Sequence, residues 1–154
     1  MCALKPEKSI ISKPLQTTVD FFLKKNTPEF GDNISNLKLQ KLVYYAQGFH
    51  LALFGKELFS EDIIAWEHGP VVEKLYYKYN QYGSAPIPEP DSANIALFTD
   101  EQLSLLNEVH DVYGQFSAWK LRNMTHSERP WIETPKNNVI DKNLMKEFFK
   151  TLLN

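Results

Sequence analysis

Apolar residues recur at helical spacing along most of this chain, and they are densest between residues 35 and 54. A helix formed there could expose only a narrow strip of its surface, so we expect it to lie at the centre of the fold. Ser35 is the expected N-terminal cap and Gly55 the expected stop, because glycine readily adopts the left-handed conformation that ends many helices. The expected inner face consists of Leu39, Leu42, Val43, Ala46, Phe49 and Leu53.

Shorter amphipathic stretches predict further helices on both sides of this segment. Each begins with a side chain that can accept a hydrogen bond from the first turn, and Thr99 followed by Gln102 is a capping-box pattern. The expected caps are Ser12, Thr99, Ser117 and Asp141. The last helix is expected to bury Leu144, Met145, Phe148 and Leu152.

A short β element is expected before the dipeptide Gly69-Pro70. Residues 63–66 include β-branched and aromatic side chains in a stretch too short for a long helix, which indicates a strand or extended piece. Gly69 can adopt conformations closed to other residues, and Pro70 suits the first position of a helix. The dipeptide therefore predicts a sharp turn into a helix over residues 71–81.

Together these elements predict a mainly α fold, with one compact helical domain over residues 13–154 and a flexible N-terminal segment over residues 1–12. A chain of 154 residues is long enough to form one hydrophobic core without a metal or a disulfide. The alternating prolines within residues 83–94 favour a large surface loop inside this domain.

Composition and charge argue against a membrane-spanning protein and against a nucleic-acid binder. The apolar fraction of 43% and the charged fraction of 23% are ordinary for a soluble globular protein, and no apolar run reaches the roughly 18 residues of a membrane span. A net charge of −2 lacks the basic surplus common in nucleic-acid binders. The single Cys2 permits no intramolecular disulfide, and no signal peptide is recognisable, so a cytoplasmic protein is expected.

The histidines do not form a metal or catalytic pattern. No pair has the spacing of a zinc-binding helix, and His50 and His110 lie on apolar helix faces, where a structural role is the commoner one. Glu67 and His68 are a possible acid–base pair, but neighbours in an extended strand point to opposite sides. We therefore expect no metal, no cofactor and no catalysis.

Tyrosines suggest a surface that binds another protein. Tyr76 and Tyr77 are adjacent on a predicted helix and cannot both face the core, and Tyr82 lies near its end. Partly exposed tyrosines supply contact area at protein interfaces, which makes these three the candidate partner-binding residues. The alternative is that they are half-buried with hydrated hydroxyl groups.

Three ordered motifs resemble the Panacea domain, a family that includes the SocA-type antitoxins. They are "LKLQKLVYYAQGFHLALFGKELF" (residues 37–59), "AWEHGPVV" (residues 65–72) and "THSERPW" (residues 125–131), and the similarity extends over nearly the whole chain. The residues that match the family pattern are interpreted as scaffold signatures: Leu39, Gln40, Lys41, Leu42, Tyr44, Tyr45, Trp66, Gly69, Pro70, Thr125, His126, Pro130 and Trp131.

The resemblance implies an antitoxin that neutralises a protein toxin encoded nearby through direct contact. SocA-type members of the family act instead as adaptors that deliver the toxin to the ClpXP protease, which is the alternative. The third hypothesis is that the protein is an enzyme of an unrecognised kind. It would require a deep polar pocket that joins His68 or His126 to carboxylates.

Overall fold

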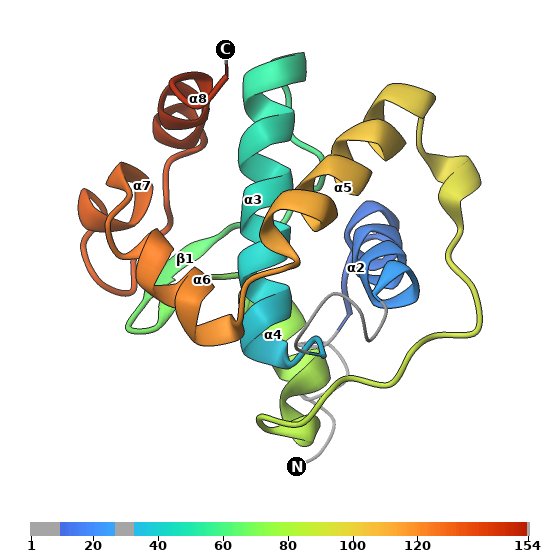
Figure 1. Ribbon diagram of the computed structural model, residues 1–154. Helices are drawn as coiled ribbons and strands as arrows, with labels where there is room; N and C mark the ends of the chain where they lie inside the picture. The colour runs from blue at the N-terminus through green and yellow to red at the C-terminus, as the bar shows by residue number, and fades with distance from the viewer. Residues whose placement is uncertain (1–9, 27–32, 154) are drawn as a thin grey trace.

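Helix α3 (Asn36–Phe54) runs through the middle of the molecule, with the other elements arranged around it (Figure 1). The computed structural model describes residues 10–26 and 33–153. These residues form a mainly α fold with a small β element, as predicted. The elements around α3 are α2 (Lys13–Lys25), β1 (Ile64–Trp66), β2 (Gly69–Val71), α4 (Glu73–Tyr79), α5 (Asp100–Tyr113), α6 (Ala118–Thr125), α7 (Arg129–Ile132) and α8 (Lys142–Lys150).

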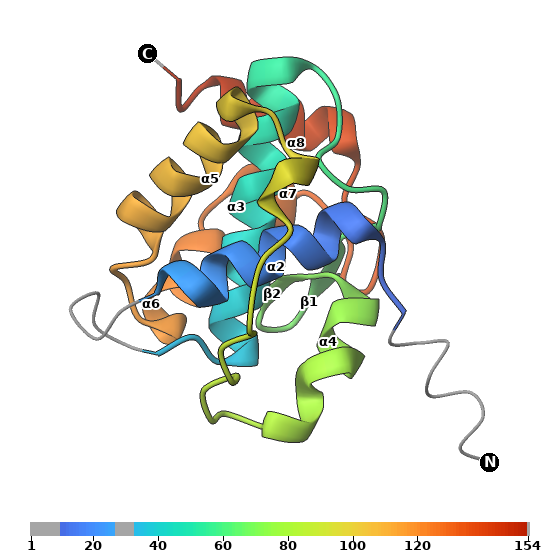
Figure 2. The ribbon, with the colours of Figure 1, turned by 90° about the vertical axis from the view of Figure 1, so that its right-hand side faces the viewer.

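The central position of α3 follows from its nearly continuous burial. Helices α2, α4, α5, α6 and α8 and strand β2 all contact it. In the view of Figure 2, α2 crosses α3, and the proline loop runs along the same face of the molecule. Within the described part of the chain, no helix is both long and apolar enough to cross a membrane.

The predicted boundaries of α3 are confirmed. The Ser35 hydroxyl accepts a hydrogen bond from the Lys38 amide at 3.3 Å, and Gly55 ends the helix at φ 74°. The prediction of the inner face is wrong for Leu53, which is 49% exposed. Phe54 and Gly55 are exposed as well, so the last turn of α3 is covered less than its middle.

The other helix caps were also predicted correctly. The capping box of α5 is complete, with Gln102 N–H donating to the Thr99 hydroxyl and Thr99 N–H donating to the Gln102 side chain. Ser12, Ser117 and Asp141 cap α2, α6 and α8. In α8 the buried side chains are Met145 and Phe149, and Leu144 and Phe148 are half-buried. Leu152 lies beyond the end of the helix at Lys150 and is 42% exposed, so its predicted burial is wrong.

Strands β1 and β2 form an antiparallel hairpin in which Trp66 is opposite Gly69. Gly69-Pro70 therefore lies in the second strand rather than in a turn into a helix, and the prediction that Pro70 begins a helix is wrong. The turn consists of Glu67 and His68, and α4 starts only at Glu73. The positive φ expected of Gly69 is confirmed at 112°.

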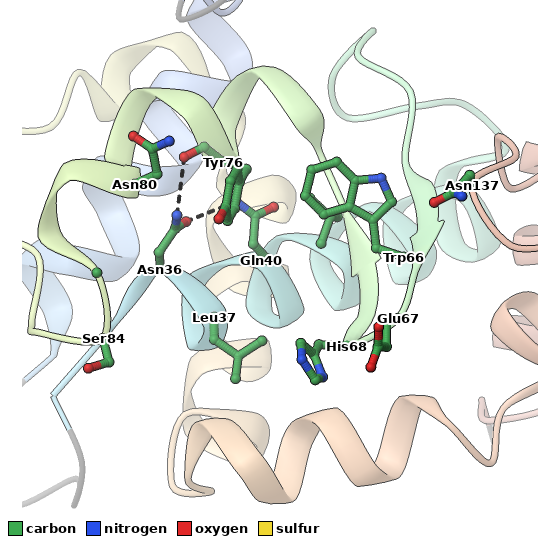
Figure 3. A pocket seen from close by; sticks show the side chains of 12 residues that line it. Asn36, Leu37, Gln40, Trp66, Glu67, His68, Tyr76, Asn80, Ser84 and Asn137 are labelled. Atoms are coloured by element: carbon green, nitrogen blue, oxygen red, sulfur yellow. Dashed lines mark hydrogen bonds between the residues drawn. The ribbon is translucent and has the colours of Figure 1, made fainter.

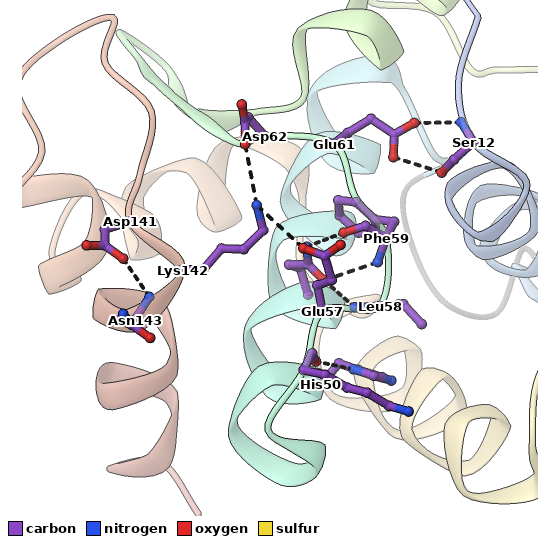
Figure 4. A network of polar contacts seen from close by, with 12 residues as sticks. Ser12, His50, Glu57, Leu58, Phe59, Glu61, Asp62, Asp141, Lys142 and Asn143 are labelled. Atoms are coloured by element: carbon purple, nitrogen blue, oxygen red, sulfur yellow. Dashed lines mark hydrogen bonds and ion pairs between the residues drawn. The ribbon is translucent and has the colours of Figure 1, made fainter.

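The loop between α3 and β1 is fastened by side-chain hydrogen bonds (Figure 4). Buried Gln47 accepts from the Leu58 amide at 2.7 Å and donates to the Phe59 carbonyl at 2.8 Å. The Glu61 carboxylate accepts from both the amide and the hydroxyl of Ser12. Ser12 is thus held in place just before α2, whereas residues 1–9 of the predicted flexible segment lie outside the described residues.

Candidate functional site

The three sequence motifs meet where the first half of α3, the hairpin and the α6–α7 region pack together. Gln40 joins two of them: its carbonyl oxygen accepts from the Val72 amide at 2.9 Å, and its amide nitrogen donates to Asn36 at 3.0 Å. Its neighbours Leu39 and Leu42 are fully buried in the core. The chain that leaves the hairpin is therefore held against α3 before α4 begins.

Lys41 is fully buried, and its ammonium group donates to the Pro70 carbonyl at 3.0 Å. Burial lowers the pKa of Lys41 to about 7, and repulsion from the Arg122 charge makes a smaller contribution in the same direction. A side chain at Gly69 would lie 2.6 Å from Lys41 Cε and 2.8 Å from Thr125 Oγ1. Glycine is thus required here both for its conformation and for the space beside Lys41 and Thr125.

Tyr44 and Tyr45 share one partly buried carboxyl group, that of Glu128. Their hydroxyls donate to its two oxygens at 3.0 Å and 2.8 Å. Burial raises the pKa of Glu128 to about 7, although the two phenol hydrogen bonds oppose the change. The Tyr45 ring also stacks on Tyr113 at 4.0 Å. Sequence reasoning did not single out Glu128, although it lies inside the third motif.

The third motif also holds the hairpin through backbone carbonyl groups. The Trp131 indole donates to the Trp66 carbonyl at 2.7 Å, and His126 Nε2 lies 2.7 Å from the Glu67 carbonyl. The rings of His126 and Trp131 are 3.9 Å apart. Thr125 and Pro130 of the same motif are buried.

A cavity of about 500 Å³ opens between the start of α3, the hairpin and α4 (Figure 3). Trp66 and Tyr76 line it with their rings in edge-to-face contact at 5.2 Å. Glu67 and His68 line it too, and the extended strand assumed for them is not formed. They form the hairpin turn, where the alternation of a pleated strand does not apply.

The three candidate tyrosines do not form one cluster. Tyr76 is half-buried in the cavity wall, and its ring contacts that of Tyr77, which is 37% exposed, at 5.6 Å. Tyr82 instead faces Tyr79, at 6.4 Å between ring centroids. The structure therefore brings only Tyr76 and Tyr77 together.

Trp119 on α6 is an exposed aromatic residue that sequence reasoning missed. It is 55% exposed, its ring lies 5.9 Å from that of His68, and the Arg122 guanidinium is 4.4 Å above it. A signal was present in the sequence, because Trp119 and Leu121 are two positions apart on a helix and cannot face the same side. Leu121 is the buried one.

His50 and His110 are buried, as predicted. His50 Nδ1 lies 2.7 Å from the Lys56 carbonyl, and its Nε2 lies 3.1 Å from Gln102 Nε2. Burial lowers the pKa of both histidines, to about 4 for His110. Among the described residues, no three of the histidine, cysteine, aspartate and glutamate side chains gather in a group that could hold a metal ion.

Comparison with models of known protein families identifies the family of this chain. The family model for the antitoxin SocA-like Panacea domain matches residues 39–132, which is more than half of the chain. The chain belongs to this family, and membership supports an antitoxin-like role with a protein partner. No curated protein and no solved structure matched the chain.

The partly buried Glu128 and the fully buried Lys41 predict opposite pH dependences of stability. The pKa of Glu128 is raised from 4.5 to about 7, so its contribution is full below pH 4.5 and is lost as the pH rises to 7. The pKa of Lys41 is lowered from 10.5 to about 7, so its contribution is full above pH 10.5 and is lost as the pH falls to 7. Together these two groups favour a minimum of stability near neutral pH.

Replacement of Glu128 by glutamine should remove the part of the pH dependence of stability that lies between pH 4.5 and 7. Between pH 4.5 and 7 the parent should lose about 3 kcal/mol of unfolding free energy more than Glu128→Gln does, at about 1.4 kcal/mol per pKa unit. Urea titrations at several pH values measure this difference, to which unchanged groups such as His110 do not contribute. Identical profiles for the two proteins would contradict the prediction.

Proposed function

We propose that this protein acts as an antitoxin that neutralises a protein toxin by direct, stoichiometric contact in the cytoplasm, without catalysing a reaction. The observation that carries the proposal is the aromatic surface around the hairpin cavity. Trp66 and Tyr76 line this cavity. The exposed rings of Tyr77 and Trp119 adjoin it through Tyr76 and His68, at 5.6 Å and 5.9 Å between ring centroids. Tryptophan and tyrosine are the residues that most often dominate binding energy at protein interfaces.

The support beneath this surface favours a preorganised interface. The Trp131 and Gln40 hydrogen bonds and the close contact of Gly69 with Lys41 hold the hairpin against α3 and α7. A surface that is already ordered loses less conformational entropy when a partner binds. The matched family segment, residues 39–132, contains all of these residues.

Co-expression with the product of the neighbouring gene, in a strain that lacks ClpXP, tests this mechanism. Direct neutralisation predicts that growth is restored and that the two proteins purify as a complex. The adaptor mechanism predicts a different result: growth fails and the toxin accumulates although the complex forms. A protein that does not bind any neighbouring gene product would contradict both mechanisms.

Alanine substitution at Tyr77 should weaken toxin binding about tenfold or more, as expected for a hot-spot aromatic residue, with little change in melting temperature. Trp119→Ala should act in the same direction. The matched control is Ile95→Ala, which removes an apolar side chain of similar exposure, 48%, from the 3₁₀ turn Ile95–Leu97. Calorimetric titration measures the effect.

Tyr82→Ala should weaken binding less than Tyr77→Ala, because Tyr82 is half-buried beside Tyr79. If the Tyr77 and Trp119 variants bind and protect as well as the Ile95 control does, the interface lies elsewhere on the molecule.

A further inference from the structure

We propose that the hairpin cavity binds an arginine or lysine side chain presented by the protein partner. That the occupant belongs to a protein rests on the proposed function. The preference for a cation rests on the chemistry of the cavity itself. Four features of the described residues support it: the two rings, one carboxylate, an amide pair and the cavity's size.

The rings of Trp66 and Tyr76 come from different elements, β1 and α4, and form two sides of the cavity (Figure 3). Their planes are inclined at 71° with centroids 5.2 Å apart. Aromatic faces carry negative partial charge, and the attraction of a cation is strongest for tryptophan. Two inclined rings can therefore contact an ammonium or guanidinium group from two directions.

Glu67 supplies a negative charge at the hairpin turn. It lines the same cavity, and no ion pair or hydrogen bond of its carboxylate occurs among the described residues. Arg122 of α6 donates to His68 Nδ1, in the cavity wall, at 3.2 Å and to Asn123 at 3.0 Å, and not to Glu67. Glu67 is thus available to a cation from outside.

The orientation of the Asn36 and Gln40 amides is determined by backbone groups at both ends of a hydrogen-bonded chain. The Val72 N–H donates to Gln40 Oε1, Gln40 Nε2 donates to Asn36 Oδ1, and Asn36 Nδ2 donates to the Tyr76 carbonyl. An amide oxygen has two lone pairs, so Asn36 Oδ1 keeps one that can accept from a cationic N–H. The wall therefore adds a neutral acceptor to the Glu67 carboxylate.

The cavity is also large enough to admit one long side chain. Its volume of about 500 Å³ lies within the usual range for ligand pockets, roughly 300–1,000 Å³. An extended arginine or lysine could place its stem along Trp66 and its charged end near Glu67, as such side chains do when they lie along apolar surfaces.

Nuclear magnetic resonance titration of the full chain tests the inference without a toxin. The probes are Nα-acetyl-arginine N-methylamide and its neutral counterpart built on citrulline, which has nearly the same shape. The arginine probe should shift the Trp66 indole signal, assigned with Trp66→Phe, with a dissociation constant on the order of millimolar. The citrulline probe should bind at least about fivefold more weakly, since it lacks the charge.

Glu67→Gln should weaken binding of the arginine probe by about fivefold, as expected for loss of an exposed ion pair, whereas Glu89→Gln, which removes the same charge from the exposed proline loop, should not. Equal binding of the two probes, or unchanged binding to Glu67→Gln, overturns the inference. Much tighter binding of free arginine than of the blocked probe overturns it too, because the site would then recognise the free amino acid.

The outcome is distinguishable from that of the co-expression test. Absence of probe binding removes the cation site but leaves direct neutralisation intact. Absence of any complex with a toxin contradicts the proposed function, and with it the protein source of the cation, even where the probe binds.

Discussion

Phe149→Ala is expected to lower the free energy of unfolding by about 3–5 kcal/mol, the usual cost of emptying a large buried aromatic site. The Phe149 ring is fully buried and meets Tyr44, Tyr45 and Phe49 edge to face, with centroids 5.3, 5.9 and 4.9 Å away. It also lies directly against Gly48, where a Cβ atom would collide with it. This contact joins α8 to the centre of α3.

Urea denaturation measures the effect, and the adjacent Phe148 provides a control. Phe148 is only half-buried, so Phe148→Ala should cost clearly less than Phe149→Ala. Equal losses for the two variants would mean that α8 is not anchored on α3 through Phe149.

Gly69→Val is expected to destabilise the protein by about 2–4 kcal/mol, the sum of backbone strain and crowding. At φ 112° a valine is strained, and its Cβ would lie 2.6 Å from Lys41 Cε and 2.8 Å from Thr125 Oγ1. Because Lys41 is fully buried, its side chain cannot move aside into solvent.

Gly83→Val separates the two causes. Gly83 also has a positive φ, 57°, but a Cβ there would meet no atom within 4 Å. That variant should therefore incur only the backbone strain, and denaturation should show a smaller loss than for Gly69→Val. If the losses are equal, the space beside Lys41 and Thr125 contributes nothing to stability.

Helix positions and ends could be predicted because the interactions that set them are local. Ser35 and Thr99 bond to amides three residues away, and Gly55 ends α3 through its own backbone conformation. The apolar density of residues 35–54 likewise indicated a central helix before any neighbour was known. The burial of His50 and His110 followed from the same periodicity.

The candidate site could be predicted only in part. The motifs indicated which segments belong to the family, and Tyr76 and Tyr77 were selected because adjacent helical residues cannot both face inward. The cavity itself was not foreseen, because Trp66 and Tyr76 approach each other from β1 and α4. Glu67 and His68 form a turn that borders that cavity, rather than the extended strand assumed for them.

The sequence alone determined the local features of the structure: the helix caps, the helical spacing of apolar residues and the positive φ of Gly69. The tertiary structure alone decided which side chains from distant parts of the sequence contact one another. Glu128 receives hydrogen bonds from tyrosines 83 and 84 positions away, and Phe149 packs against a helix that ends about a hundred residues earlier. The physical reason is that helical periodicity reports how far apart side chains lie on one element, whereas the packing of separate elements depends on shapes and charges that no local pattern contains.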